Sequence, residues 1–184
     1  MTQLASKQQL RMSFLRWAMV TVPAVLLLGL LAGASASGGA DNPWYQALAK
    51  PPLTPPDWVF PAVWTALYIL LGFALAMVLN ARGAPGRGLA VLLFVAEMLI
   101  NFSWNPIFFG AHHVLMALVL IVAMLLIGLA VAITFGRIRA AAGWLLVPYL
   151  AWLCFAAVLT WGIHSLNPDA DALVPSAGST QIVL

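Results

Sequence analysis

Five stretches of this chain are apolar over a length that can cross a lipid bilayer. They cover residues 14–33, 59–79, 89–109, 114–135 and 140–163. A helix needs about 20 residues to span the hydrocarbon core, and it satisfies its backbone polar groups internally, as the absence of water there requires. The sequence therefore predicts an all-α membrane protein: a bundle of five transmembrane helices with a long, partly structured loop between the first and the second.

The composition also indicates that the solvent is a lipid bilayer. Of the 184 residues, 64 % are apolar and 7 % are charged, whereas about 25 % of residues are charged in a soluble domain. The net charge of +3 is small and scattered, which argues against nucleic acid as a partner. Cys154 is the only cysteine, so an internal disulfide is excluded and no metal site is expected.

The basic residues provide an independent test of the five spans. With five spans, seven of the eight Lys and Arg residues fall on one side of the membrane and Lys50 alone on the other. The seven are Lys7, Arg11, Arg16, Arg82, Arg87, Arg137 and Arg139. This asymmetry predicts a multi-pass protein with a cytoplasmic N-terminus. We expect one transmembrane domain over residues 1–167 and a disordered polar tail over 168–184.

The first span has two interpretations. Basic residues, an apolar run and then "ASASGG", with Ala34 and Ala36 as an A-x-A site, are typical of a cleaved signal peptide. Gly29 and Gly33 form a G-x-x-x-G pair, which favours a retained helix that packs closely on a neighbour. We expect the helix to be retained, and the same pair is a candidate dimer contact.

Few polar groups lie at membrane depth, and two of them share the third span. Glu97 and Asn101 are four residues apart, so they lie on one helix face together with Trp104. An ionisable group at the centre of a membrane helix costs about 2.5–3.5 kcal/mol on insertion scales, so Glu97 should face protein or water. For Glu97 we favour a structural hydrogen bond between helices. For Asn101 a structural bond and a ligand contact are equally open.

Aromatic residues recur at helical spacing on the second and fifth spans. They are Phe60, Trp64 and Tyr68, and then Trp144 and Trp152, with Pro148 and Ala156 on the same face. Such stripes are more often packing or an interfacial belt than a ligand platform, and Trp17 and Trp144 fit the belt. Trp64, Trp104 and Trp152 lie deeper and share spans with polar groups. Apolar walls with a few polar atoms are typical of a small-molecule site.

The loop before the second span is unusually rich in rings. Residues 42–64 read "NPWYQALAKPPLTPPDWVFPAVW", with Trp44, Tyr45 and Trp58 ahead of the span. Thr54 followed by Pro55 and Asp57 predicts a capped helix that starts at Pro55. Lys50 is the only cation on this side of the membrane, and His112 and His113 lie in a turn on the same side. The two histidines have two interpretations. They contact an anionic group of a ligand, or they are solvated turn residues, and we favour the second.

No catalytic constellation is present. The chain has no Ser–His–Asp set, no metal-ligand spacing such as H-E-x-x-H and no phosphate-binding loop. A single buried carboxylate is weak support for acid–base chemistry. A binding protein is therefore expected rather than an enzyme.

Three blocks resemble one known family. "WYQALAKPPLTPPDWVFPAVWTALY", "NFSWNPIFFGA" and "PYLAWLCFAAVLTW" followed by "LN" are similar, in this order and spacing, to the tryptophan-rich sensory proteins of bacteria. Their mitochondrial relatives are the translocator proteins, or peripheral benzodiazepine receptors. The resemblance covers residues 20–167. It implies a five-helix bundle, a homodimer, and a first loop that closes a cavity for porphyrins, including protoporphyrin IX, or for benzodiazepine-type ligands.

The resemblance also implies the site residues. The family's cavity motifs fall on Trp64 and Tyr68, on Asn101 and Trp104, and on Trp152 and Ala156. With their neighbours, the expected ligand-binding set is Trp44, Trp58, Phe60, Trp64, Tyr68, Asn101, Trp104, Trp152, Ala156 and Leu159. No cofactor is expected to be required, and protoporphyrin IX or a related tetrapyrrole is the expected ligand.

This chain departs from the family at two places. Glu97 stands where the family often has glutamine. The animal cholesterol pattern needs a Tyr and then a Lys or Arg late in the last helix, but "VLTWGIHSLN" has Trp161 and His164 there, so specific cholesterol binding is not expected. The resemblance implies a porphyrin-binding receptor or regulator. The alternatives are light- or oxygen-dependent degradation of protoporphyrin IX and simple transport, although the paired broken helices of many transporters are missing.

Overall fold

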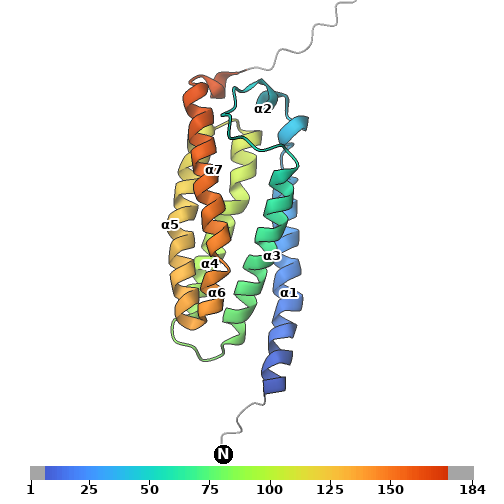
Figure 1. Ribbon diagram of the computed structural model, residues 1–184, viewed down its shortest axis with the longest axis vertical. Helices are drawn as coiled ribbons and strands as arrows, with labels where there is room; N and C mark the ends of the chain where they lie inside the picture. The colour runs from blue at the N-terminus through green and yellow to red at the C-terminus, as the bar shows by residue number, and fades with distance from the viewer. Residues whose placement is uncertain (1–6, 174–184) are drawn as a thin grey trace, which may run out of the picture.

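The computed structural model describes residues 7–173, which form an elongated bundle of helices (Figure 1). Five long helices run along it: α1 (Lys7–Gly33), α3 (Val59–Asn80), α4 (Arg87–Asn105), α5 (Val114–Ile138) and α7 (Val147–Leu166). The shorter elements are η1 (Gly39–Asp41), α2 (Pro43–Ala47), η2 (Pro106–Gly110), α6 (Ala140–Trp144) and η3 (Ala170–Ala172). Five segments are long and apolar enough to cross a membrane. The predicted five-helix membrane fold is confirmed.

The predicted fifth span consists of two helices. α6 ends at Trp144 and α7 begins at Val147, so Pro148 lies in the first turn of α7. Proline has no N–H and its ring collides with the carbonyl four residues earlier, so it is tolerated in a first turn but not in a helix interior. The break between α6 and α7 therefore follows from Pro148.

The second span starts at residue 59 as predicted, but the capped helix start predicted at Pro55 is wrong. α3 begins at Val59, with Trp58 before it and no side-chain cap. Thr54 instead donates its backbone N–H to the Pro51 carbonyl in a turn, and its Oγ1 is buried without a partner among the described residues. The residue before a proline is pushed out of the helical region. Because Pro56 follows Pro55, a helix that starts at Pro55 is disfavoured.

The first helix packs closely on α3. Thr21 Oγ1 donates a hydrogen bond of 2.8 Å to the Gly72 carbonyl, and a Cβ on Gly72 would lie 2.6 Å from the Val22 Cα. A Cβ on Gly29 would collide with the Tyr68 ring, whereas a Cβ on Gly33 would have no neighbour within 4 Å. The close contact predicted for Gly29 is thus made inside the chain, and it does not leave Gly29 free for a dimer contact.

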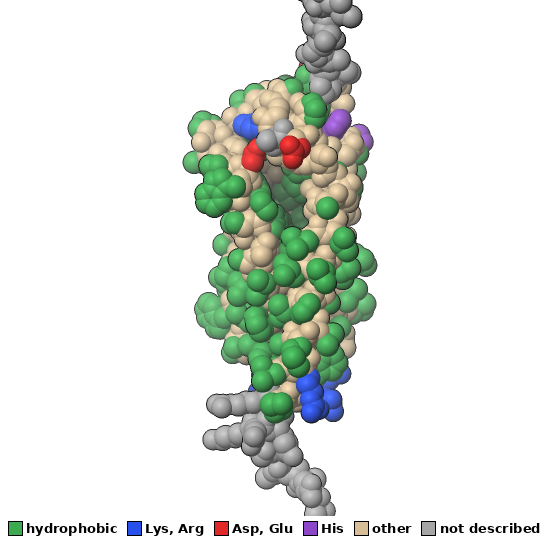
Figure 2. All heavy atoms as spheres, turned by 90° about the vertical axis from the view of Figure 1, so that its right-hand side faces the viewer, with side chains coloured by type: hydrophobic (Ala, Val, Ile, Leu, Met, Phe, Trp, Pro, Cys, Tyr) green, Lys and Arg blue, Asp and Glu red, His purple; other side chains and the backbone are tan. Residues whose placement is uncertain are grey.

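Charges separate to the two ends of the bundle. Lys and Arg side chains gather at the end where the chain enters α1, whereas acidic side chains, with a basic one beside them, lie at the end that carries the loop of residues 34–58 (Figure 2). The loop itself contains Lys50. We call the two ends the arginine end and the loop end. The segregation agrees with the predicted five spans. The side chains of Lys7 and Arg11 lie outside the described residues, and the cytoplasmic side of the N-terminus stays a prediction.

The chain after α7 folds back onto the loop end. Residues 168–173 form a turn and η3, and the Ala170 carbonyl accepts a hydrogen bond of 2.8 Å from Trp44 Nε1. The disordered tail predicted from residue 168 therefore does not begin there. Its remaining residues, 174–184, lie outside the described part of the chain.

Candidate ligand-binding cavity

A cavity of about 560 Å³ lies in the loop-end half of the bundle, beneath the loop. Cavities of about 300–1,000 Å³ hold small molecules and cofactors. Its wall is made by α1 (Gly29, Leu30, Ala32, Gly33), the loop (Gly38, Gly39, Asp41, Tyr45, Thr54, Asp57), α3 (Phe60, Pro61, Trp64, Tyr68), α4 and η2 (Asn101, Trp104, Asn105, Phe108, Phe109), α5 (Ile121, Met124) and α7 (Trp152, Leu153, Ala156, Leu159, Thr160, Ile163). The face on which α1 and α3 lie is hollowed below the acidic side chains (Figure 2).

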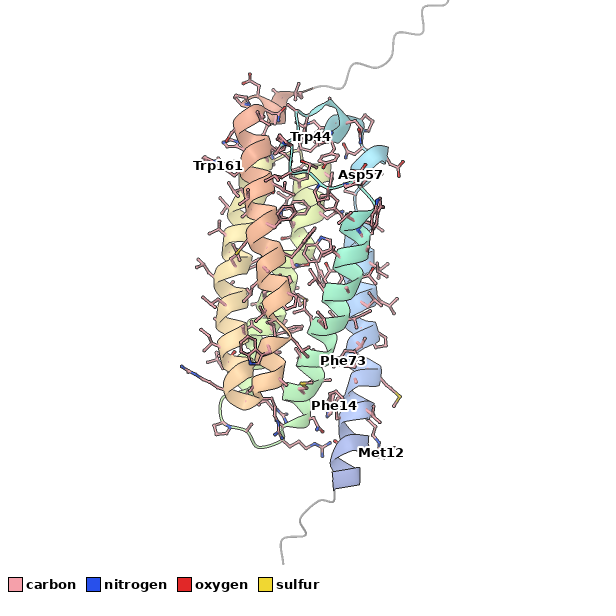
Figure 3. The ribbon with its side chains drawn as sticks, in the orientation of Figure 1. Met12, Phe14, Trp44, Asp57, Phe73 and Trp161 are labelled. Carbon is pink, nitrogen blue, oxygen red and sulfur yellow. The ribbon has the colours of Figure 1, made fainter. Side chains whose placement is uncertain are left out.

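Most of the predicted site residues lie on this wall. They are Phe60, Trp64, Tyr68, Asn101, Trp104, Trp152, Ala156 and Leu159. They come from α3, α4 and α7, and the loop that carries Trp44 and Asp57 lies at the same end of the bundle (Figure 3). Helices far apart in the sequence thus bring the three resemblance blocks to one place.

Trp44 and Trp58 do not lie on the cavity wall. Trp44 is 1 % exposed, and its ring stacks on His112 at 4.5 Å and meets Phe108 edge-on at 5.3 Å. Trp58 is 71 % exposed, on the outer surface. Trp44 therefore packs inside the loop end, and neither ring lines the cavity.

The wall offers flat aromatic surfaces on several sides. Trp64 stacks on Tyr68 with ring centroids 5.3 Å apart. Phe60 of α3 meets Trp152 of α7 edge-on at 5.9 Å. Trp104 stacks on Phe108 at 4.8 Å with the planes 9° apart. Such surfaces suit a flat, apolar molecule.

A chain of hydrogen bonds runs from the wall into the core. Tyr68 Oη donates to Asn101 Oδ1 at 2.8 Å, Asn101 Nδ2 donates to Tyr149 Oη at 3.1 Å, and Tyr149 Oη donates to Glu97 Oε1. Glu97 is 2 % exposed and lies off the cavity wall. The structural interpretation of Glu97 agrees with this arrangement. Asn101 joins α3 to α7 through its hydrogen bonds to Tyr68 and Tyr149, and it also lines the cavity. Its contact with a ligand stays a prediction.

Three asparagines that the sequence analysis missed hold the loop end together. Asn42 caps α2 by accepting from the Tyr45 N–H at 2.9 Å and also donates to the Phe109 carbonyl at 3.1 Å. Asn105 donates to the Gly33 carbonyl at 2.9 Å. Asn167 accepts from the Ala49 N–H and donates to the Ala49 carbonyl, at 2.9 and 2.8 Å. Each precedes a proline, and Asn-Pro is a turn signal that would have pointed to them.

The cations of the loop end do not line the cavity. Lys50 Nζ lies over the Tyr45 ring, 4.5 Å from its centroid. His113 Nδ1 lies 3.2 Å from Asp171 Oδ2 with more than half of each side chain exposed, and His112 stacks on Trp44. Because none of these three side chains lines the cavity, an anionic ligand group there would meet no basic side chain on the described wall. Tyr45, which does line the cavity, stays neutral more readily: burial raises its pKa, and the nearby Asp57 carboxylate raises that pKa further.

The fold defines an integral, multi-pass membrane protein, and its five spanning helices and the loop line one cavity. The comparisons with known proteins give the family: the TspO/MBR family matches residues 19–166, and the chain belongs to it.

Curated relatives match across nearly their whole length. The tryptophan-rich protein TspO of Chlorobaculum tepidum is 38 % identical over 149 residues, 78 % of this chain and 94 % of the relative. The tryptophan-rich sensory protein of Cereibacter sphaeroides is 37 % identical, over 76 % of this chain and 90 % of the relative. The translocator protein of Bos taurus is 33 % identical, over 76 % and 84 %. The resemblance stated from the three sequence blocks is confirmed.

Proposed function

We propose that this protein is a membrane receptor or regulator that binds a porphyrin, with protoporphyrin IX or a related tetrapyrrole as its ligand. The observation that carries the proposal is the cavity of about 560 Å³ with aromatic rings from three helices on its wall. A porphyrin is a flat, apolar macrocycle, and flat rings gain binding energy from aromatic surfaces on either face. Membership of the TspO/MBR family supports the same ligand class.

The ligand is expected to bind between α3 and α7. Trp64 and Trp152 supply stacking surfaces, and Asn101 meets a polar edge with the N–H that Tyr149 does not use. Ala156 leaves room in the wall of α7, so a larger side chain there would narrow the cavity without removing a contact. A homodimer, as the resemblance implies, stays part of the proposal.

Tryptophan-fluorescence quenching by protoporphyrin IX tests the site. Stacking of a base on an aromatic ring is worth about 1–3 kcal/mol per ring in other systems, so Trp152→Ala should weaken binding about tenfold or more. Ala156→Leu should weaken it by filling the cavity. Trp144→Ala is the matched control, because Trp144 is 73 % exposed on α6 and lies off the wall. Equal affinity for wild type, Trp152→Ala and Ala156→Leu would place the site elsewhere.

Degradation of protoporphyrin IX is the second candidate function. The observation in its favour is the contact of Trp64 with Tyr68 and with Tyr149, at 5.3 and 6.2 Å between ring centroids, because tryptophan and tyrosine are the side chains best able to exchange an electron with an excited macrocycle. Absorbance of the bound porphyrin, followed in light and in darkness, separates the two. An unchanged spectrum supports a receptor, and a new product spectrum with the protein unconsumed supports an enzyme.

A further inference from the structure

The charged groups at the cavity are all of one sign. Asp41 of η1 and Asp57, just before α3, are the charged side chains on the described wall. A Cβ on Gly39 would lie 3.3 Å from the Asp57 Cγ, so η1 runs directly beside Asp57 and brings Asp41 to the same part of the mouth. Figure 2 shows acidic side chains directly above the hollow. The mouth of the cavity is therefore a negatively charged rim.

Within residues 7–173, no basic side chain forms an ion pair with Asp41 or Asp57. The ion pair found there joins His113 to Asp171, away from the cavity. Lys50 lies nearest in sequence, but its ammonium group is held over the Tyr45 ring and forms no ion pair with either carboxylate. The two negative charges thus face whatever enters the mouth.

Two buried polar groups on the wall lack a hydrogen-bond partner among the described residues: the Thr54 hydroxyl, which can donate and accept, and the Trp104 indole N–H. An indole N–H only donates, and a buried donor without a partner is costly. A ligand that fills the cavity therefore gains by placing a hydrogen-bond acceptor, such as a carbonyl oxygen, against Trp104.

A porphyrin with free carboxylates fits this arrangement less well than its ester does. A carboxylate is strongly disfavoured in an apolar interior unless it is paired, so the acid groups of a porphyrin must lie at the mouth, in water. There they meet Asp41 and Asp57 at short range, and like charges repel. Esterification removes the charge and leaves carbonyl oxygens as acceptors.

We propose that the cavity selects uncharged tetrapyrroles, those whose carboxyl groups are esterified, over the free acids, through the acidic rim of Asp41 and Asp57. This inference rests on the proposed function and narrows its ligand class. Protoporphyrin IX and its dimethyl ester are the two probes, because they share one macrocycle and differ by two negative charges.

The test compares each probe on wild type and on the double variant Asp41→Asn and Asp57→Asn, which keeps the size of both side chains. Affinity is measured by tryptophan-fluorescence quenching on the full-length protein in one detergent. The variant-to-wild-type ratio is taken for each probe separately, so that partition of the ester into micelles cancels. Asp169→Asn is the matched control, since Asp169 is exposed at the loop end but off the cavity wall.

The double variant should tighten binding of the free acid by about threefold or more, and it should leave the ester unchanged. The gain should shrink as salt is raised, because exposed charges are screened. Asp169→Asn should change neither probe. If the double variant does not fold, Asp41→Asn alone is tested in its place, and it should give about half of the gain in affinity for the free acid.

Two results would count against the proposal in different ways. Binding of both probes with no gain for the free acid in any neutralised variant overturns the charge selection and leaves the porphyrin site standing. Failure of both probes to bind the folded wild-type protein overturns the proposed function and this inference with it.

Discussion

Replacement of Glu97 tests whether this buried carboxyl group serves the fold or the ligand. Glu97 accepts a hydrogen bond from Tyr149 Oη and lies off the cavity wall. Glutamine offers a carbonyl oxygen in the same place, so Glu97→Gln should keep the bond. Leucine has nearly the same volume but no acceptor, so Glu97→Leu isolates the loss of the hydrogen bond.

The loss of stability expected for Glu97→Leu depends on the hydrogen-bond partners that Tyr149 retains. Hydrogen bonds between membrane helices are worth about 0.6 kcal/mol on average and reach about 1.7 kcal/mol. Without Glu97 the Tyr149 hydroxyl still accepts from Asn101, but its hydrogen is left with the Met124 Sδ at 3.9 Å, a weak acceptor. We therefore expect Glu97→Leu to cost about 1–2 kcal/mol of unfolding free energy. Glu97→Gln should stay within about 0.5 kcal/mol of wild type, since an amide–hydroxyl bond replaces a carboxyl–hydroxyl bond.

The assay is equilibrium unfolding in mixed micelles, followed by helical circular dichroism. A double-mutant cycle of Glu97→Leu with Tyr149→Phe measures the coupling between the two side chains directly. The reasoning fails if Glu97→Gln is as damaging as Glu97→Leu, or if the cycle shows no coupling. It also fails if Glu97→Gln changes porphyrin affinity, because the group is then acting on the ligand.

The remaining predictions concern helix packing, the loop and the topology. Gly29→Leu should lower stability by about 1–3 kcal/mol, because its side chain would collide with the Tyr68 ring, whereas Gly33→Leu meets open space; equal unfolding curves for the two variants would refute this contact. Asn167→Ala should speed hydrogen exchange at the Ala49 amide, because that amide loses its hydrogen-bond partner. Ser165→Ala is the control and should leave this exchange rate unchanged, because the Ser165 hydroxyl donates to the Trp161 carbonyl of its own helix. In a Cys154→Ala background, Pro85→Cys and Leu173→Cys should be labelled from opposite sides of the membrane; labelling from one side would contradict five spans.

The helices could be predicted because hydropathy over 20 residues is a strong and local signal. The predicted and observed starts agree at Val114 and Ala140, and they agree at Val59 even though the capping argument favoured Pro55. The errors have local causes. Pro148 interrupts an apolar run whose hydropathy is uniform, and Pro56 excludes the helical start that Thr54 otherwise suggests. Both prolines are visible in the sequence, so these errors were avoidable.

The loop was harder to predict, because its rings look alike in the sequence and differ only in their distant partners. Trp64 reaches the cavity since it lies on the inner face of α3, one turn before Tyr68. Trp44 is instead committed to the Ala170 carbonyl, 126 residues away along the chain. No periodicity within the loop encodes a partner at that separation, and only the family resemblance places Trp44 in the expected ligand-binding set.

The same distant contacts tie the loop to one wall of the cavity. Asn167 follows the last residue of α7 and holds Ala49 of the loop with two hydrogen bonds, and α7 also carries Trp152 and Ala156 on the cavity wall. A ligand that displaces α7 must therefore strain the Asn167 contacts or move the loop with the helix. Conversely, when the loop opens at Ala49, the end of α7 next to Asn167 loses its two hydrogen bonds to the loop. We therefore expect a ligand in the cavity to change the position of the loop, and opening of the loop to change the affinity for that ligand.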